Sequence, residues 1–119
     1  MSDEDDRRRA LEQLIRFDIP LEDARQRLRE FPWDSERELV LLDLRSVLNI
    51  LHRAQQGLLS TEDVSAWAEA LEVREDVGFA SGHSDIVKEF LFEAANPAIN
   101  GFDDHAITNW ELRLSAILP

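Results

Sequence analysis

The sequence predicts an all-α protein: a single compact globule of about six helices packed around a central apolar helix at about residues 36–56. Along most of the chain, apolar residues recur at spacings of three and four, which is typical of helices that bury one face. Prolines, glycines and capping residues divide the chain into stretches of helical length. The alternating pattern of a half-buried strand extends over no more than about four positions. A chain of 119 residues has the size of one domain, so residues 1–119 are expected to form a single unit.

The first two helices are expected on either side of Pro20. The first helix, at about residues 4–17, has an acidic start that suits the positive end of a helix dipole, and residues 1–5 are expected to be disordered. Pro20 is tolerated in the first turn of a second helix, in which apolar residues recur at helical spacing between charged ones. Pro32 ends that helix, because proline cannot continue the helical hydrogen-bond pattern.

The third helix, at about residues 36–56, is expected to be the central one. Ser35 and Glu38 form the S-x-x-E pattern of a capping box where it begins. Gly57 is the residue type that commonly ends a helix. Apolar residues surround much of the circumference of this helix, so other helices should pack around it.

Three further helices are expected, at about residues 61–73, 84–95 and 103–118. Ser60 and Asp63 repeat the capping pattern before the first of these. Turn-forming residues separate each helix from the next. The three tryptophans, Trp33, Trp67 and Trp110, are expected in the core or at joints between helices, because their positions match the apolar stripes.

The bulk composition excludes several classes of partner and of chemistry. A formal net charge of −12 argues against binding to nucleic acid or to anionic membranes, which would repel the chain. No window approaches the run of about 18 apolar residues that a membrane span needs, and no signal peptide is recognisable at the start. The sequence contains no cysteine, which excludes disulfides and cysteine-ligated metals and suits a reducing cytoplasm. We therefore expect a cytoplasmic protein.

The acidic excess is concentrated between residues 57 and 95. That segment holds nine acidic residues against only Arg74 and Lys88. On the helix expected at 61–73, the glutamates fall opposite the apolar side, and the acidic surface continues into the connector behind it. The residues proposed to bind a partner on this surface are Glu62, Glu69, Glu72, Glu75 and Asp76.

This acidic surface has two interpretations. A row of carboxylates with few neighbouring cations speeds the encounter with a basic partner protein and suppresses other partners. The same row can also be a solvated helix face that serves only to keep the protein soluble.

Phe92 is a second candidate for contact with a partner. It falls on the polar side of the helix expected at 84–95, between Glu89 and Glu93, as an aromatic anchor inside a charged rim would. The alternative is that another helix or a loop of the same chain covers it.

The connector at 75–85 is the stretch that most resembles an active site. Ser81, His83 and Asp85 supply a hydroxyl, an imidazole and a carboxylate, the groups that nucleophilic catalysis combines. Neighbours in sequence do not by themselves adopt that geometry, and turn and helix-capping roles explain the same residues. No spacing typical of a metal site and no phosphate-binding loop occurs in the sequence, so no cofactor is expected.

Several local patterns together resemble a group of small acidic bacterial proteins, over roughly residues 14–118. The resemblance implies no activity, and no catalytic residue is carried over from it. In size, charge and helicity the chain is also similar in type to immunity proteins, the cytosolic antidotes to bacterial toxins. The patterns that carry the resemblance are Ile19-Pro20-Leu21, Phe31-Pro32-Trp33-Asp34, Glu38-Leu39-Val40, Leu59-Ser60-Thr61-Glu62-Asp63-Val64, Trp67-Ala68, Asp76-Val77-Gly78-Phe79 and Phe92-Glu93-Ala94-Ala95-Asn96-Pro97.

We therefore expect a non-enzymatic, acidic protein-binding module. Its most specific version is an immunity-type inhibitor that neutralises a basic toxin or effector. A second version is an accessory or scaffold subunit of a larger bacterial complex, which would bind through an apolar interface around Phe92. A small hydrolase that uses the connector at 75–85 is the remaining alternative.

Overall fold

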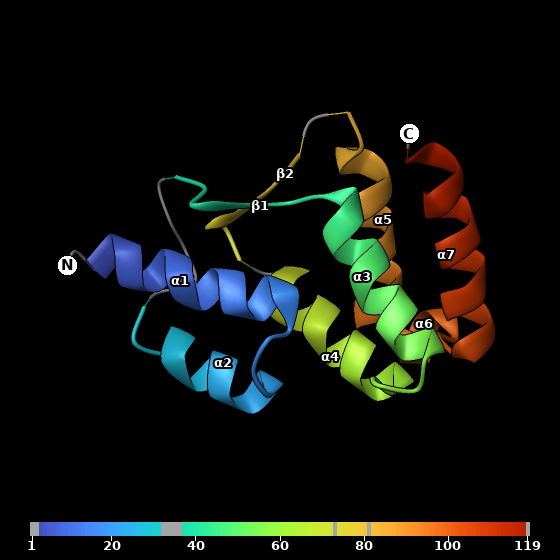
Figure 1. The fold of residues 1–119 in the computed structure, drawn as a ribbon, viewed down its shortest axis with the longest axis horizontal. Helices are drawn as coiled ribbons and strands as arrows, with labels where there is room; N and C mark the ends of the chain where they lie inside the picture. The colour runs from blue at the N-terminus through green and yellow to red at the C-terminus, as the bar shows by residue number, and fades with distance from the viewer. Residues whose placement is uncertain (1–2, 32–36, 73, 81, 119) are drawn as a thin grey trace.

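The computed structural model describes residues 3–31, 37–72, 74–80 and 82–118 (Figure 1). Within them the fold is all-α, with seven helices and one small parallel sheet of two strands, which confirms the predicted fold class. The elements are α1 (Asp3–Arg16), α2 (Leu21–Leu28), β1 (Val40–Leu42), α3 (Leu44–Gln55), α4 (Thr61–Glu72), β2 (Val77–Phe79), α5 (Ser84–Ala95), α6 (Pro97–Asn100) and α7 (Asp104–Ile117).

The molecule is elongated, with extents of 42 × 29 × 25 Å. The α1–α2 hairpin forms one end, and α3, α5 and α7 form the other, where α3 packs against α7 (Figure 1). The two strands run between these ends, and α4 lies below them and contacts α1, α2, α3 and α5. No helix in the described part of the chain combines the length and the apolar character that a membrane crossing needs.

The helices expected in the second half of the chain are confirmed to within about two residues, as α4, α5 and α7. Local capping explains this agreement for α4 and α7. The amide of Asp63 donates to Ser60 Oγ over 3.0 Å, and the amide of Ser60 donates back to Asp63 Oδ2 over 2.9 Å. Asp103 caps α7, because its side chain accepts a hydrogen bond from the amide of Ala106.

The prediction of one helix over residues 36–56 is wrong at its start. Residues 37–43 are not helical, β1 occupies part of this stretch, and α3 begins only at Leu44, where the Asp43 side chain accepts a 2.8 Å hydrogen bond from the amide of Ser46. A short continuous apolar run fits a strand as well as a helix, and here a partner strand decides between them. The expected cap residue Ser35 lies outside the described residues.

Two smaller expectations also need correction. Residues 1–5 were expected to be disordered; residues 1 and 2 lie outside the described residues, and α1 already begins at Asp3, where Glu4 and Asp5 form ion pairs with Arg8 over 3.3 and 3.4 Å. Acidic side chains in a first turn favour the helix through its dipole, which explains the early start. Between α5 and α7, where only turn-forming residues were expected, residues 97–100 form a short helix, α6, and Gly101 ends it with a left-handed φ of 64°.

The small sheet joins segments that two helices separate in sequence. β1 and β2 are parallel, with Val40 opposite Val77 and Leu42 opposite Phe79. Because α3 and α4 lie between the two strands in the chain, their pairing is a long-range contact that no local sequence pattern predicts. β2 also lies inside the connector at 75–85, for which turns and no strand were expected.

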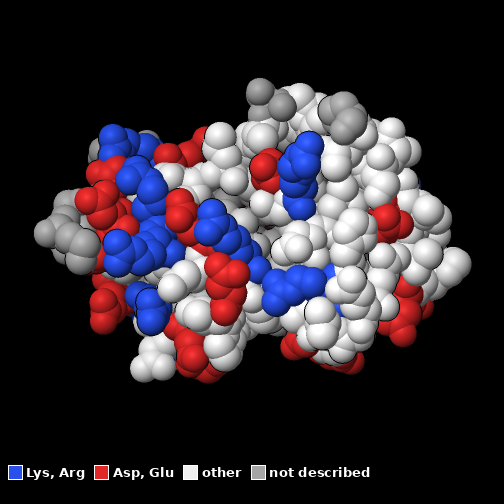
Figure 2. Space-filling model, viewed as in Figure 1, with Lys and Arg blue, Asp and Glu red and all other residues white. Residues whose placement is uncertain are grey.

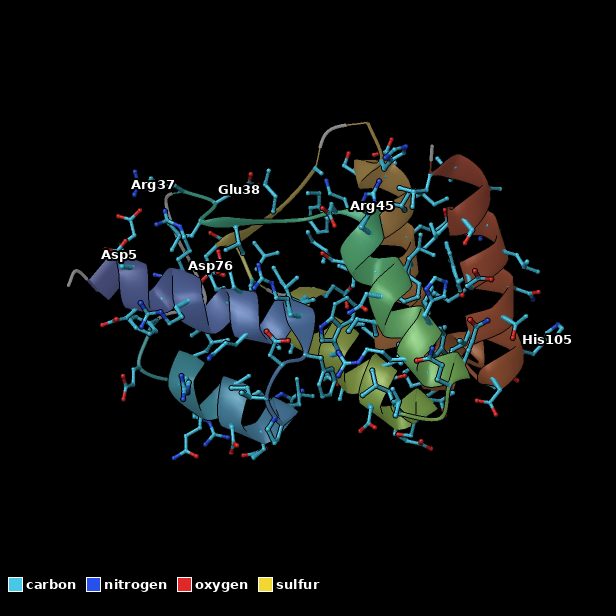
Figure 3. The ribbon with its side chains drawn as sticks, in the orientation of Figure 1. Asp5, Arg37, Glu38, Arg45, Asp76 and His105 are labelled. Atoms are coloured by element: carbon cyan, nitrogen blue, oxygen red, sulfur yellow. The ribbon has the colours of Figure 1, made fainter. Side chains whose placement is uncertain are left out.

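Asp76, immediately before β2, is a buried carboxylate at the junction of α1 with the sheet (Figure 3). Its side chain is 0% exposed and accepts hydrogen bonds from Arg7 Nε of α1 at 2.8 Å and from Arg74 Nε and Nη2 at 2.9 and 2.8 Å. Its main-chain oxygen accepts from the amides of Leu39 at 2.8 Å and Val40 at 3.3 Å. One residue thus fixes α1, the start of the sheet and the segment that leaves α4.

Two tryptophans anchor the core on either side of the molecule. Trp67 is fully buried, and its Nε1 donates a 2.8 Å hydrogen bond to the main-chain oxygen of Leu14, which holds α4 against α1. Trp110 of α7 packs edge-to-face on Phe90 of α5, with ring centroids 5.4 Å apart, and its Nε1 donates to the Glu93 carboxylate. The core placement predicted for these two tryptophans is confirmed, and Trp33 lies outside the described residues.

Replacing Asp76 by asparagine is expected to lower the free energy of unfolding by about 3 to 5 kcal/mol, because it removes the buried carboxylate to which the largely buried Arg7 and Arg74 both donate. Urea unfolding followed by circular dichroism measures this change. Glu75→Gln removes one negative charge at the neighbouring, exposed position and should change the free energy by less than about 0.5 kcal/mol. Equal effects of the two substitutions would contradict the role given to Asp76.

Glu111 of α7 has a lowered pKa, so its contribution to stability depends on pH. Its pKa lies below the ordinary value of 4.5, first because the Ser115 hydroxyl donates to Oε1 at 2.8 Å, and next because His52 of α3 bonds the same oxygen at 3.2 Å. A pKa lowered on folding contributes stability that is present above pH 4.5 and lost as the pH falls through the lowered value. NMR titration of the carboxylate should show this pKa, and Ser115→Ala should raise it toward 4.5. A pKa that the substitution leaves unchanged would contradict the assignment.

Candidate functional site

The site proposed from the sequence is centred on α4, whose position in the fold is fixed by its buried side. Val64, Trp67, Ala68 and Leu71 are all buried there. The hydrogen bond between Trp67 and α1 and the capping box at Ser60 then set its rotation and its start. The outward side of α4 is therefore presented in a defined orientation.

Glu62, Glu69 and Glu72 lie on the outward side of α4, and all three are exposed, as expected. We call these three residues the acidic face. At about 100° per residue they fall within one arc of the helix, opposite Trp67 and Leu71. Glu75 is also exposed, immediately beyond the end of α4.

The carboxylates of the acidic face form no ion pair within the described residues. Glu62 accepts only a 3.3 Å hydrogen bond from the neighbouring Thr61 hydroxyl. Arginines of α1 and α2 could have neutralised these carboxylates, but those that form ion pairs do so with Asp76, Glu4, Asp5 and Glu22. The acidic face therefore remains available to a cation from outside the chain.

One edge of the acidic face borders a hollow of about 440 Å³ between α2 and α4, which we call the arginine hollow. It combines three guanidinium groups with one carboxylate over an apolar floor. Glu69 belongs to both the hollow and the acidic face. It lines the hollow together with the three arginines but, in the described part of the chain, forms no ion pair with any of them. The hollow is lined by Leu14, Arg25, Leu28, Arg29, Phe31, Glu69, Ala70 and Arg74.

The inclusion of Asp76 in the acidic surface is wrong. α4 ends at Glu72, so Asp76 does not continue its outward side, and the Asp76 carboxylate is buried between Arg7 and Arg74. Its negative charge is compensated inside the protein and cannot meet a partner. The physical reason is that two arginines from distant segments supply the counter-charge that makes burial of this carboxylate possible.

Phe92 is 53% exposed on α5, so no other part of the described chain covers its side chain fully. It lies opposite the buried stripe of α5, which includes Phe90 and Ala94. The structure therefore presents Phe92 outward on a different helix from the acidic face. Other large apolar side chains in the last third of the chain are exposed as well, namely Ile99 at 77% and Leu112 at 62%.

Of the connector residues considered for catalysis, the structure describes His83 and Asp85. Within the described residues, no hydrogen bond joins His83 to a hydroxyl or a carboxylate, and Ser81 lies outside them. His83, Ser84 and Asp85 line a shallow hollow beside Ile117. A hydrolytic site would need a base within hydrogen-bond reach of its nucleophile.

The remaining histidines offer no metal site in the part of the chain that the structure describes. No three His, Asp or Glu side chains there gather closely enough to hold a metal ion. His52 pairs with Glu111 between α3 and α7. His105 points away from the protein near the start of α7 (Figure 3).

The arginine hollow is the feature that sequence reasoning missed. Arg25 and Arg29 are four residues apart on α2 and so share one side of that helix, which is a usable signal. Arg74 comes from beyond α4, and no sequence pattern connects it to α2. On the face drawn in Figure 2, Lys and Arg side chains gather mainly over the α1–α2 end, mixed with Asp and Glu side chains, and further acidic side chains lie at the edge of the opposite end.

Comparisons with known proteins add no family to this description. No protein-family model matches the chain, and no match was found among curated protein sequences or among solved structures. The geometry and the charges of the described residues are therefore the basis for a functional proposal.

Proposed function

We propose that this protein is a non-enzymatic bacterial cytoplasmic module that binds a partner protein carrying a basic surface, and that the acidic face of α4 makes the contact. The observation that carries the proposal is the combination of exposure and missing ion pairs at Glu62, Glu69 and Glu72. A chain with a net charge of −12 and 13 basic residues leaves these three carboxylates uncompensated on a rigidly held helix.

The physical consequence is electrostatic complementarity. Negative charge fixed on one helix face attracts a positive surface over a distance of about one Debye length, roughly 8 Å in physiological salt, and orients it on approach. Because the helix is anchored by Trp67 and the Ser60–Asp63 capping box, little conformational freedom is lost when the partner binds. An immunity-type inhibitor of a basic toxin is the most specific function that fits this surface.

An apolar interface is the second candidate, and the exposure of Phe92, Ile99 and Leu112 favours it. These residues belong to α5, α6 and α7, away from the outward side of α4. In that case the protein would be an accessory subunit whose binding depends on burial of aromatic and aliphatic groups.

Charge reversal separates the two candidates once a partner has been captured from a lysate of the native host. The double variant Glu69→Lys/Glu72→Lys is expected to weaken the complex by at least about tenfold, because it opposes like charges across the interface. Surface plasmon resonance measures the dissociation constant. The double variant Glu12→Lys/Asp18→Lys, which makes the same change of net charge at exposed positions outside the acidic face, should leave it within about threefold.

The apolar interface predicts the reverse pattern: Phe92→Ala weakens the complex, whereas reversal of Glu69 and Glu72 does not. Equal weakening by the two charge-reversal variants would also contradict the proposal, because it would mean that overall charge matters and the acidic face does not.

A further inference from the structure

The arginine hollow is locally positive in a strongly negative protein. Arg25, Arg29 and Arg74 line it together with a single carboxylate, that of Glu69, whereas the whole chain has a net charge of −12. Asp76, behind Arg74, is shared between Arg74 and Arg7, and Arg29 pairs over 3.4 Å with the exposed Glu22, so these two carboxylates compensate only part of the positive charge. This concentration of guanidinium groups shares only Glu69 with the acidic face, and it favours a ligand of negative charge.

The guanidinium groups of Arg25 and Arg74 are held in place but still have donors to offer, and that of Arg29 is exposed. Arg74 is 9% exposed and uses Nε and Nη2 on Asp76. Arg25 is half-buried, and its Nη2 donates to the main-chain oxygen of Ala66 at 3.3 Å. A guanidinium group carries more N–H donors than these contacts use, and its planar arrangement matches a carboxylate.

The floor of the hollow has a different character. Leu14 and Leu28 are buried beneath it, and Phe31 and Ala70 are partly exposed at its walls. A volume of about 440 Å³ lies within the range of sites that hold small molecules or single side chains. An apolar group of the ligand can therefore bury its surface here while its charged end meets the arginines.

We propose that the arginine hollow binds a monoanionic carboxylate attached to a short apolar group, as at the C-terminus of a peptide that ends in an aliphatic residue. Glu69 on the rim and the overall negative charge act against a ligand with several charges, such as a phosphate ester. The apolar floor acts against a bare inorganic anion, because such an ion leaves that floor exposed to water. This proposal does not depend on the function proposed for the acidic face.

N-acetyl-leucine is a suitable probe, and NMR titration of the full-length, isotope-labelled chain detects weak binding. The expected result is saturable shifts at Arg25 and Arg29 Nε and at the Ala70 amide. Arg29→Gln, at an exposed position where folding should not be affected, is expected to weaken binding by about tenfold, as is Arg25→Gln. Arg27→Gln, which makes the same charge change on the same helix outside the hollow, should leave the affinity unchanged. Glu69→Gln should strengthen binding, because it removes a like charge from the rim.

Three further titrations decide the chemical class of the ligand. N-acetyl-leucinamide tests the need for the charge, acetate tests the need for the apolar group, and inorganic phosphate tests a multiply charged ion. Weaker binding of all three than of N-acetyl-leucine supports the proposal. Equal or tighter binding of any of them, absence of saturable shifts, or an equal loss in Arg27→Gln would overturn it.

Discussion

A carboxylate can be buried only where positive charge and hydrogen-bond donors surround it, and in this protein Asp76 receives both from segments far apart in the chain. Arg7 comes from α1, Arg74 follows α4, and the amides of Leu39 and Val40 belong to the start of β1. The α1–α2 hairpin, the sheet and the end of α4 therefore meet at one residue. If this arrangement were lost, α1 would keep its contacts with α2 and the Trp67 bond, but it would lose the ion pair that joins it to the residue before β2.

Sequence analysis predicted the parts of this structure that local interactions determine. α4, α5 and α7 were placed correctly because capping residues and apolar spacing act within a few residues of one another. The exposure of Glu62, Glu69 and Glu72 followed from the same periodicity. The burial of Asp76 could not be predicted, since it depends on Arg7, which is 69 residues away. The strand β1 was missed for a similar reason, because only the pairing with β2 makes an apolar run a strand rather than a helix.

The distribution of charge explains why two surfaces of opposite sign lie side by side. Residues 1–30 hold seven of the 13 basic residues, all arginine, together with nine acidic residues, whereas residues 57–95 hold nine acidic residues against only two basic ones. When α2 packs against α4, the arginines of α2 meet only one edge of the acidic face, at Glu69. The rest of that face is exposed to solvent, and the arginine hollow lies where α2 meets α4. The acidic face and the arginine hollow are therefore neighbouring sites for which different ligands are proposed. Among the described residues, the packing of α2 against α4 leaves most of their opposite charges without ion pairs to each other.

We infer that Asp76 and the groups that donate to it belong to the cooperative core of the protein. Native-state hydrogen exchange of the Leu39 and Val40 amides, which donate to the Asp76 main-chain oxygen, tests this claim most directly. Exchange measured at increasing, sub-denaturing urea should give these two amides the same opening free energy as the amides of Leu51 and Leu91 in the buried helices. A lower opening free energy that does not respond to urea would show that the junction opens locally, and it would contradict the account.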